Sequence, residues 1–201
     1  MTARLILKHP NPKLRITSLK VDNEDWAERV EKWCTDIKDT MKANAGLGLA
    51  APQVDIHKRI FAVDVKDLDE PGIFQQDPQD STLFFINPEI KHITKDDSKS
   101  IEACLSVPGV MYPVKRSSEI VITYATPDRR QISVQVKGED SVVLQHEYDH
   151  LNGKLFIDRL NPFDRKEFMK RFEKPKREKS EGEINQLREQ KRAQARKNRK
   201  K

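Results

Sequence analysis

The sequence predicts an α+β fold in which small antiparallel sheets pack around a central helix. Three observations support this fold class. Apolar residues recur at steps of three and four over residues 22–46, which is the period of an amphipathic helix. Short strand-like runs then follow one another without a helix between each pair, which favours antiparallel pairing. A second helical segment comes after the last of these runs, near residues 140–152.

The first helix is expected in DNEDWAERVEKWCTDIKDTMKANAG, where Asp22 or Asn23 can cap the start and Gly46 lies past the end. Cys34 lies at the rim of the apolar stripe and is expected to be a small packing residue. The stripe itself consists of Trp26, Val30, Trp33, Ile37 and Met41.

The strands are expected in four runs that turn-forming residues separate, namely Pro71-Gly72, Pro127-Asp128 and Gly138. Residues 66–81 form a longer irregular insert, which we interpret as a surface loop rather than a functional lid. The four runs are KRIFAVDV (58–65), TLFFINPEI (82–90), SEIVITYAT (118–126) and QISVQV (131–136).

Composition indicates one folded domain and a polar appendage. The 201 residues are 36% hydrophobic and 35% charged, with a net charge of +6. From Arg165 to Lys201, 16 Lys and Arg face 6 Asp and Glu, a net of +10, so the preceding 164 residues carry −4. We expect a catalytic domain over residues 1–172 and a basic tail, partly helical or disordered, over residues 173–201.

The N-terminal residues and the cysteine count favour a cytoplasmic protein. MTARLILKHPNPKLR fits neither a signal peptide nor a membrane span, and it lacks the composition of a transit peptide. Two cysteines provide no disulfide framework, which is typical of a reducing compartment.

The segment QHEYDHLNG carries the motif H-E-x-x-H, formed by His146, Glu147 and His150. A helix starting near Asp140 or Ser141 and ending at Asn152-Gly153 would place Val143 and both histidines on one face. Two imidazoles at this spacing can bind one divalent ion, and the adjacent carboxylate can act as a base toward a bound water. The alternative is a helix with two solvated histidines, but Leu144 and Leu151 flank the motif and indicate a half-buried helix, which argues against it. The motif alone is also compatible with a metalloprotease.

Two further segments could complete such a site. IEACLSVPG (101–109) offers Cys104 in what is expected to be a tight loop, and the alternative for this thiol is a buried, inert packing role. GLGLAAPQ (46–53) has small residues that let the backbone approach a ligand closely, and Gln53 at its end brings an amide donor. The alternative for this segment is a glycine-rich turn between helix and strand.

The segments GLGLAAPQ, EACLS and QHEYDHLNG, in this order, resemble the three motifs of peptide deformylases. The resemblance extends from about Ile6 to Phe172 and includes LKHPNPKLR and INPEI. It implies a metallohydrolase that removes the formyl group from the N-terminal formylmethionine of nascent polypeptides and releases formate, with water on the metal attacking the formyl carbon. By this resemblance Cys104, His146 and His150 are the metal ligands, and Glu147 is the catalytic acid/base. Gln53 and the Leu105 N–H are the oxyanion donors. Gly48 belongs both to the catalytic group and to the substrate cleft, which Leu47 and Val142 also line.

Two positions depart from the family pattern. Ala103 stands where glycine is common, which matters only if the backbone there needs a positive φ. Met111 stands where many bacterial members have an arginine that holds the substrate, so the peptide preference is less defined than the chemistry. The resemblance favours ferrous iron as the metal, and the ligand set also suits zinc, nickel or cobalt.

The competing functions are an H-E-x-x-H endopeptidase and a ribosome- or RNA-binding protein with a decayed catalytic site. The tail motivates the second, because its charge suits a polyanion such as ribosomal RNA. Residues 164–172 are expected to be helical before Pro175, and beyond them Ile184 and Leu187 are the only large apolar residues. The alternative for the tail is a solvated, solubilising segment.

Overall fold

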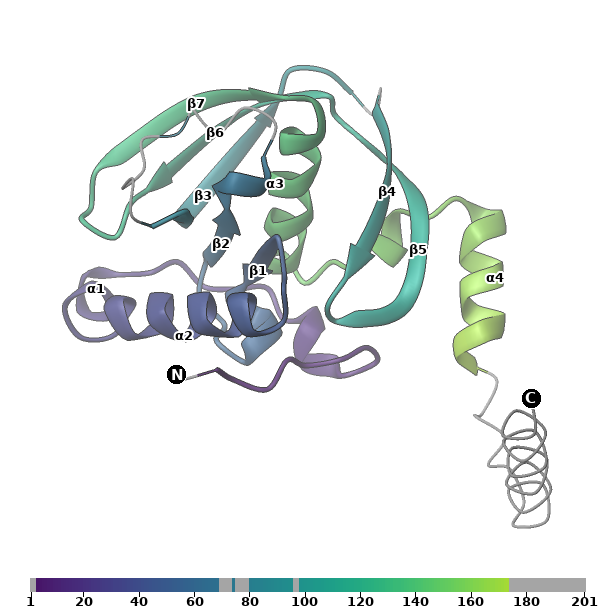
Figure 1. Ribbon diagram of the computed structural model, residues 1–201, viewed down its shortest axis with the longest axis horizontal. Coiled ribbons are helices and arrows are strands. Elements are labelled where there is room, and N and C mark those ends of the chain that lie inside the picture. Colours follow the sequence, from purple (N-terminus) through teal and green to yellow (C-terminus); the bar gives the residue numbers. More distant parts are fainter. Residues whose placement is uncertain (1–2, 69–73, 75–79, 96–97, 174–201) are drawn as a thin grey trace, which may run out of the picture. The chain divides into compact units, whose positions relative to one another are not determined.

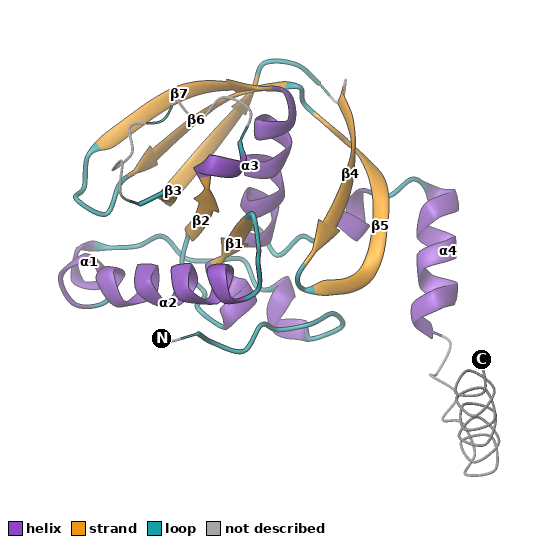
Figure 2. Cartoon of the chain, in the orientation of Figure 1, coloured by secondary structure: helices purple, strands orange, loops and turns teal. Residues whose placement is uncertain are grey.

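A computed structural model describes residues 3–68, 74, 80–95 and 98–173 of the chain. Within these residues the fold is α+β with antiparallel sheets, as predicted (Figure 2). No helix in this part of the chain is long and apolar enough to cross a membrane. The helices are α1 (Asn23–Glu28), α2 (Val30–Ala43), α3 (Gly138–Leu151) and α4 (Pro162–Glu173), and the strands are β1 (Gly48–Ala50), β2 (Ile60–Asp64), β3 (Thr82–His92), β4 (Ser98–Cys104), β5 (Val107–Arg116), β6 (Glu119–Ala125) and β7 (Gln131–Lys137).

The larger sheet has the strand order β1-β2-β3-β6-β7, and every neighbouring pair in it is antiparallel. The runs predicted at 58–65, 82–90, 118–126 and 131–136 correspond to β2, β3, β6 and β7. β2 is buried along its whole length because α2 and α3 both pack against it, which explains the uninterrupted apolar sequence IFAV. β1 has no strand beyond it in the described sheet, so it forms an edge.

Helix α3 lies between the larger sheet and the β4–β5 hairpin (Figure 1). Leu144 and Leu151 of this helix join a cluster of buried side chains that includes Phe61, Phe85 and Tyr124 of the sheet. Because strands or loops surround the helix, it also buries many polar side chains. The prediction of a central helix between small sheets is therefore confirmed.

The first helix of the sequence is divided in two, where a single helix was expected. Asp22 caps α1, and a reciprocal bond with Asp25 completes a capping box. At Arg29 the backbone leaves the helical region with φ −130°, and α2 starts at the next residue. The predicted apolar stripe nevertheless holds, because Val30, Ile37 and Met41 are buried against β1 and β2.

The tight loop expected over residues 101–109 is not observed, because most of this segment belongs to two strands. Ile101–Cys104 complete β4, residues 107–109 begin β5, and the turn itself is only Leu105-Ser106. Polar residues in β4 and the residues Pro108, Gly109 and Pro113 in β5 weaken the strand signal of this hairpin. The strands form because their inward faces pack toward α3 and the segment Phe156–Arg159, a contact that local propensity does not report.

Two other expected segments are described in part. Residues 69–73 and 75–79 of the 66–81 insert, and the tail from residue 174 onward, lie outside the described residues. The helix expected over residues 164–172 is present as α4, in which the rings of Phe168 and Phe172 lie 4.5 Å apart. The described residues divide after Pro162 into two units, so nearly all of α4 belongs to the second.

Gly153, just after α3, combines a left-handed backbone with a close contact. Its φ is +67°, and a Cβ built on it would lie 2.7 Å from the carbonyl carbon of Arg15. Gly109 also has a positive φ, +78°, but a Cβ there would meet nothing within 4 Å.

We predict that Gly153→Ala lowers the free energy of unfolding by at least about 2 kcal/mol, because conformational strain and the clash with Arg15 add up. Gly109→Ala is the matched control and should lose only about 1 kcal/mol. Urea unfolding of both variants measures the difference. Equal losses would mean that the contact with Arg15 does not constrain the end of α3.

Candidate metal centre

Helix α3 directs two histidines toward the end of β4. His146 and His150 are separated by about one helical turn, so both imidazoles leave the same side of α3. Cys104, the last residue of β4, lies opposite, and the ligand atoms of the three residues lie within 4.8 Å of one another. The Cys104 Sγ and His150 Nε2 are 3.4 Å apart, close to the roughly 3.5 Å between two ligands of one tetrahedral ion. The predicted Cys/His/His group is therefore assembled.

A carboxylate fixes the tautomer of the first histidine. The His146 Nδ1 lies 2.6 Å from the Glu102 Oε2, and because a carboxylate only accepts, Nδ1 must carry the proton. The Nε2 of His146 is then free of hydrogen and can bind a metal. The same contact makes the ring a better electron donor, so the residues present suit a divalent ion.

Glu102 is held in turn by a fully buried arginine. The Arg116 Nε and one terminal nitrogen donate to the two Glu102 oxygens at 2.7 and 2.8 Å, a bidentate pair. The other terminal nitrogen of Arg116 donates to Asp149, which also accepts from Arg159 at 2.5 and 2.7 Å. The Arg116 side chain is 0% exposed, so this pairing links β4, β5 and α3 without competition from water.

The ion pairs set the protonation of Glu102. Burial would raise the pKa of this carboxyl, but the hydrogen bonds from Arg116 and His146 outweigh it and lower the pKa from 4.5 to about 2. A carboxyl with a depressed pKa in the folded state stabilises the fold above its unfolded pKa. This contribution is therefore complete above about pH 4.5 and is lost as the pH falls toward about 2.

The thiol of Cys104 lies in a positive environment. Burial alone would raise its pKa, but the charge of His150 and the hydrogen bonds from both histidines hold the pKa well below its usual value. The Ser106 N–H and the Gln53 Nε2 lie 3.4 and 3.5 Å from the Cys104 Sγ and donate toward it. The thiolate, which is the form that binds metals, is thus favoured.

Gln53 is held in place partly by its own segment, GLGLAAPQ (46–53). Its side-chain oxygen accepts from the Ala50 N–H at 2.8 Å, and its Nε2 donates to the Ser106 hydroxyl at 3.0 Å. The amide is only 2% exposed and reaches the metal-ligand group from β1's side of the site.

The N-terminal segment secures both loops of the site. The Leu7 N–H donates to the Gln53 carbonyl and the His9 N–H to the Ser106 carbonyl, each at 2.8 Å. The Lys8 ammonium donates to the Leu105 carbonyl at 2.5 Å. The segment LKHPNPKLR therefore acts as a strap across the turn that follows Cys104.

Glu147 lies against Gly48. A Cβ on Gly48 would lie 2.6 Å from the Glu147 Oε1, so only glycine leaves room for this carboxylate. Glu147 is 5% exposed, and its Oε2 has no hydrogen-bond partner among the described residues. Burial raises the pKa of Glu147 against the opposing charges of His146 and His150. The site thus holds a carboxylate with one free oxygen beside the ligand group.

Four residues named from the sequence remain, and each lies at a different position. Leu47 precedes the edge strand β1, and its carbonyl accepts from the Asp64 N–H at 2.9 Å. Val142 is buried on α3, one turn before His146. Ala103 is not among the described residues with a positive φ, so its methyl group strains nothing, and Met111 is 69% exposed on β5.

Sequence reasoning missed Glu102, Arg116 and Asp149. A signal existed for Glu102, because residues two apart in a strand point to the same side, and Glu102 precedes Cys104 by two. A signal for Asp149 was its place inside the histidine motif. Arg116 lies 12 residues beyond Cys104 on a strand that was not predicted, and no local pattern marks it.

We predict that Arg116→Met lowers the free energy of unfolding by about 3–5 kcal/mol, because it leaves Glu102 and Asp149 buried without their shared partner. Arg130→Met is the control, since the Arg130 and Asp128 side chains are 55% and 60% exposed and such pairs contribute at most about 1 kcal/mol. Denaturant unfolding at neutral pH compares the two. Similar stabilities would refute the importance of the buried network.

A family model and individual relatives of this chain indicate the same family. The family model described as "Polypeptide deformylase" matches residues 3–166. A peptide deformylase of Cellvibrio japonicus is 37% identical over 170 residues, covering 84% of this chain and 93% of the relative.

Solved structures agree. The peptide deformylase of Thermotoga maritima is 32% identical with a TM-score of 0.69, and the alignment covers 80% of this chain and 99% of that one. The Plasmodium falciparum peptide deformylase, in complex with an inhibitor, is 34% identical with a TM-score of 0.70, and covers 83% and 95%. Together with the largely buried Cys/His/His group, these matches identify the chain as a member of the peptide deformylase family, a family of metal-dependent hydrolases.

Proposed function

We propose that the protein hydrolyses the N-terminal formyl group of formylmethionyl nascent polypeptides and releases formate. The observation that carries this proposal is a largely buried Cys104/His146/His150 group with the unpartnered Glu147 oxygen beside it. Three protein ligands leave a coordination position open, which is typical of catalytic rather than structural metal sites. The family membership supports the choice of a formyl amide as substrate.

The metal proposed for this site is ferrous iron, with zinc, nickel or cobalt as chemically suitable substitutes. A thiolate and two imidazoles bind all of these ions. A divalent ion held by these residues supplies Lewis acidity, which polarises a carbonyl and lowers the pKa of water to roughly 7.

Glu147 is the proposed general acid and base. Its free oxygen can accept a proton from the attacking water and then deliver that proton to the leaving α-amine. A pKa raised by burial brings the carboxyl nearer to neutral pH, where both transfers are efficient. Gly48 supports this role by leaving space for the carboxylate.

Gln53 and Leu105 are the proposed donors to the developing oxyanion. One Gln53 N–H is used by the Ser106 hydroxyl, whereas the contact toward the Cys104 Sγ is long, 3.5 Å, and can be exchanged for a substrate oxygen. The Leu105 N–H lies on the turn that the N-terminal strap secures. Loss of one such donor typically removes ~2.7–4 kcal/mol of transition-state stabilisation.

The proposed cleft runs along β1. This strand is an edge of the described sheet, so its free side can pair with an extended peptide, next to Leu47, Gly48 and Val142. The small residues of GLGLAAPQ allow the site to close on a formyl hydrogen and to exclude a methyl group.

We predict that protein purified without oxygen releases formate from formyl-Met-Ala-Ser, whereas acetyl-Met-Ala-Ser is hydrolysed at least about 100-fold more slowly. The physical reason is the space available at the formyl carbon. Comparable rates for the two peptides would overturn the proposed selectivity.

Glu147→Gln should retain the metal and lose turnover by about 100-fold or more, because an amide cannot cycle a proton. Metal analysis and formate release on the same sample separate the two properties. Near-normal turnover would remove Glu147 from its proposed role.

We also propose a cytoplasmic enzyme with a catalytic domain over residues 1–172 and a basic tail over 173–201 that contacts ribosomal RNA. The net charge of +10 from Arg165 onward supports a polyanionic partner. The sequence has no aromatic residue beyond Phe172, which favours phosphate contacts over base stacking.

A chain ended at Lys174 should hydrolyse a short formyl peptide normally but bind ribosomes more weakly, with a smaller dependence on salt. Co-sedimentation with ribosomes at low and moderate salt measures this. Unchanged binding at low salt would contradict a role for the tail.

A further inference from the structure

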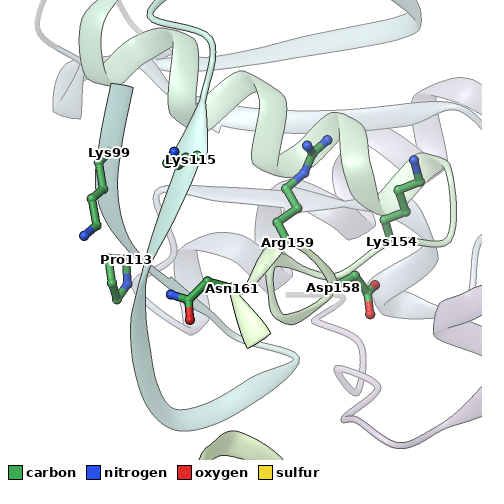
Figure 3. Close-up of a pocket in the computed structure, with 7 residues that line it drawn as sticks. All are labelled: Lys99, Pro113, Lys115, Lys154, Asp158, Arg159 and Asn161. Atoms are coloured by element: carbon green, nitrogen blue, oxygen red, sulfur yellow. The ribbon is translucent and has the colours of Figure 1, made fainter. Parts of the chain in front are cut away.

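A basic pocket lies on the catalytic domain outside the metal centre (Figure 3). The β4–β5 hairpin forms one wall, and residues 154–161 form the other. Its volume is about 670 Å³. The lining residues are Lys99, Pro113, Lys115, Lys154, Asp158, Arg159 and Asn161.

The three lysines of this pocket make no ion pair with any described carboxylate. Most other lysines in the described part of residues 1–162 do, for example Lys13 with Asp55 and Lys38 with Asp80. The carboxylate that lines the pocket is already neutralised, because Asp158 pairs with Arg15. Asp149, the partner of the lining Arg159, also pairs with Arg116. The pocket therefore keeps a positive charge although residues 1–164 carry a net −4.

Two of the lysines occupy paired positions on the two strands of the hairpin. Lys99 and Lys115 are direct partners in the β4–β5 register, and both side chains are exposed. Like charges at directly opposed positions destabilise a sheet. An anion bound between the two ammonium groups would remove this repulsion. Anion binding therefore accounts for a pair of residues that otherwise destabilises the hairpin.

We propose that this pocket binds the phosphate backbone of RNA, independently of the basic tail. The ammonium groups of Lys99 and Lys154 lie on opposite sides of the pocket and do not converge on one point, so they fit successive phosphates better than a single small anion (Figure 3). Among the residues that the structure describes, no aromatic ring lines the pocket, so these residues offer no platform for base stacking. The choice of RNA rests on the proposed function, because a nascent formylated chain is found on a ribosome.

The test compares two double variants of the full-length chain. Lys99→Gln/Lys115→Gln removes two charges from the pocket. Lys91→Gln/Lys95→Gln removes two exposed charges that also lack a described carboxylate partner but do not line the pocket. Fluorescence anisotropy with a labelled oligouridine of about 12 nucleotides, at several salt concentrations, measures both affinity and its salt dependence.

The pocket variant should bind the oligouridine about 10-fold more weakly at low salt. The slope of log affinity against log salt should become shallower by about 1.4, the value for two phosphate contacts to a single strand. The control should keep the wild-type slope. Equal effects of both variants would overturn the proposal, because binding would then follow net charge alone. Displacement of the labelled RNA by an acidic peptide at concentrations as low as those of unlabelled RNA would also overturn it.

A reversal of the charge at Lys99 distinguishes RNA binding from a purely structural role of this residue. Lys99→Glu creates an opposite-charge pair with Lys115, so it should raise the unfolding midpoint by about 1–3 °C while weakening RNA binding further. Loss of both stability and binding would argue that Lys99 only supports the hairpin. Formate release from a short peptide is measured in parallel and should be unchanged, so failure of the RNA site and failure of the proposed hydrolysis are distinguishable.

Discussion

The pairing of Arg116 with Glu102 is the interaction on which the site depends. Removing an arginine from water is unfavourable, and it is tolerated here because two carboxylates, Glu102 and Asp149, accept all three of its donor nitrogens. These partners come from β4 and α3, so the pairing determines how the hairpin that carries Cys104 meets the helix that carries the histidines. Through Glu102 the same pairing sets the tautomer and orientation of His146.

Helix α3 lacks a simple amphipathic pattern because other elements of the catalytic domain surround it. Ser141, Gln145 and Glu147 are buried on it, and the first two are satisfied by the Ser117 backbone, where the hairpin leads into the larger sheet. Glu147 is the exception, because its Oε2 has no partner among the described residues. A buried carboxylate of this kind destabilises the fold. Its position beside the ligand group is consistent with a part in the proposed reaction.

The local sequence was sufficient for the parts that carry their own signal. The spacing of His146 and His150 predicted one helical face, and the apolar run around Phe61 predicted a strand. The β4–β5 hairpin was not predicted, because Pro108, Gly109 and the charged residues argue against strands when read alone. Arg116 could not be recognised for the same reason. The structural role of Arg116 comes from its contacts with Glu102 and Asp149, which are 14 and 33 residues away in the sequence.

We infer that the Cys104 thiolate completes the ligand set, and metal content tests this role most directly. Wild type, Cys104→Ser and Cys34→Ser are purified without oxygen and analysed for bound metal. Cys34 is the control because it is also buried, and burial raises its thiol pKa to about 12, which keeps it protonated. We predict about one ion per chain for wild type and Cys34→Ser, and loss of the ion from Cys104→Ser. Equal metal content in all three would contradict the assignment and favour a centre built on the histidine motif alone.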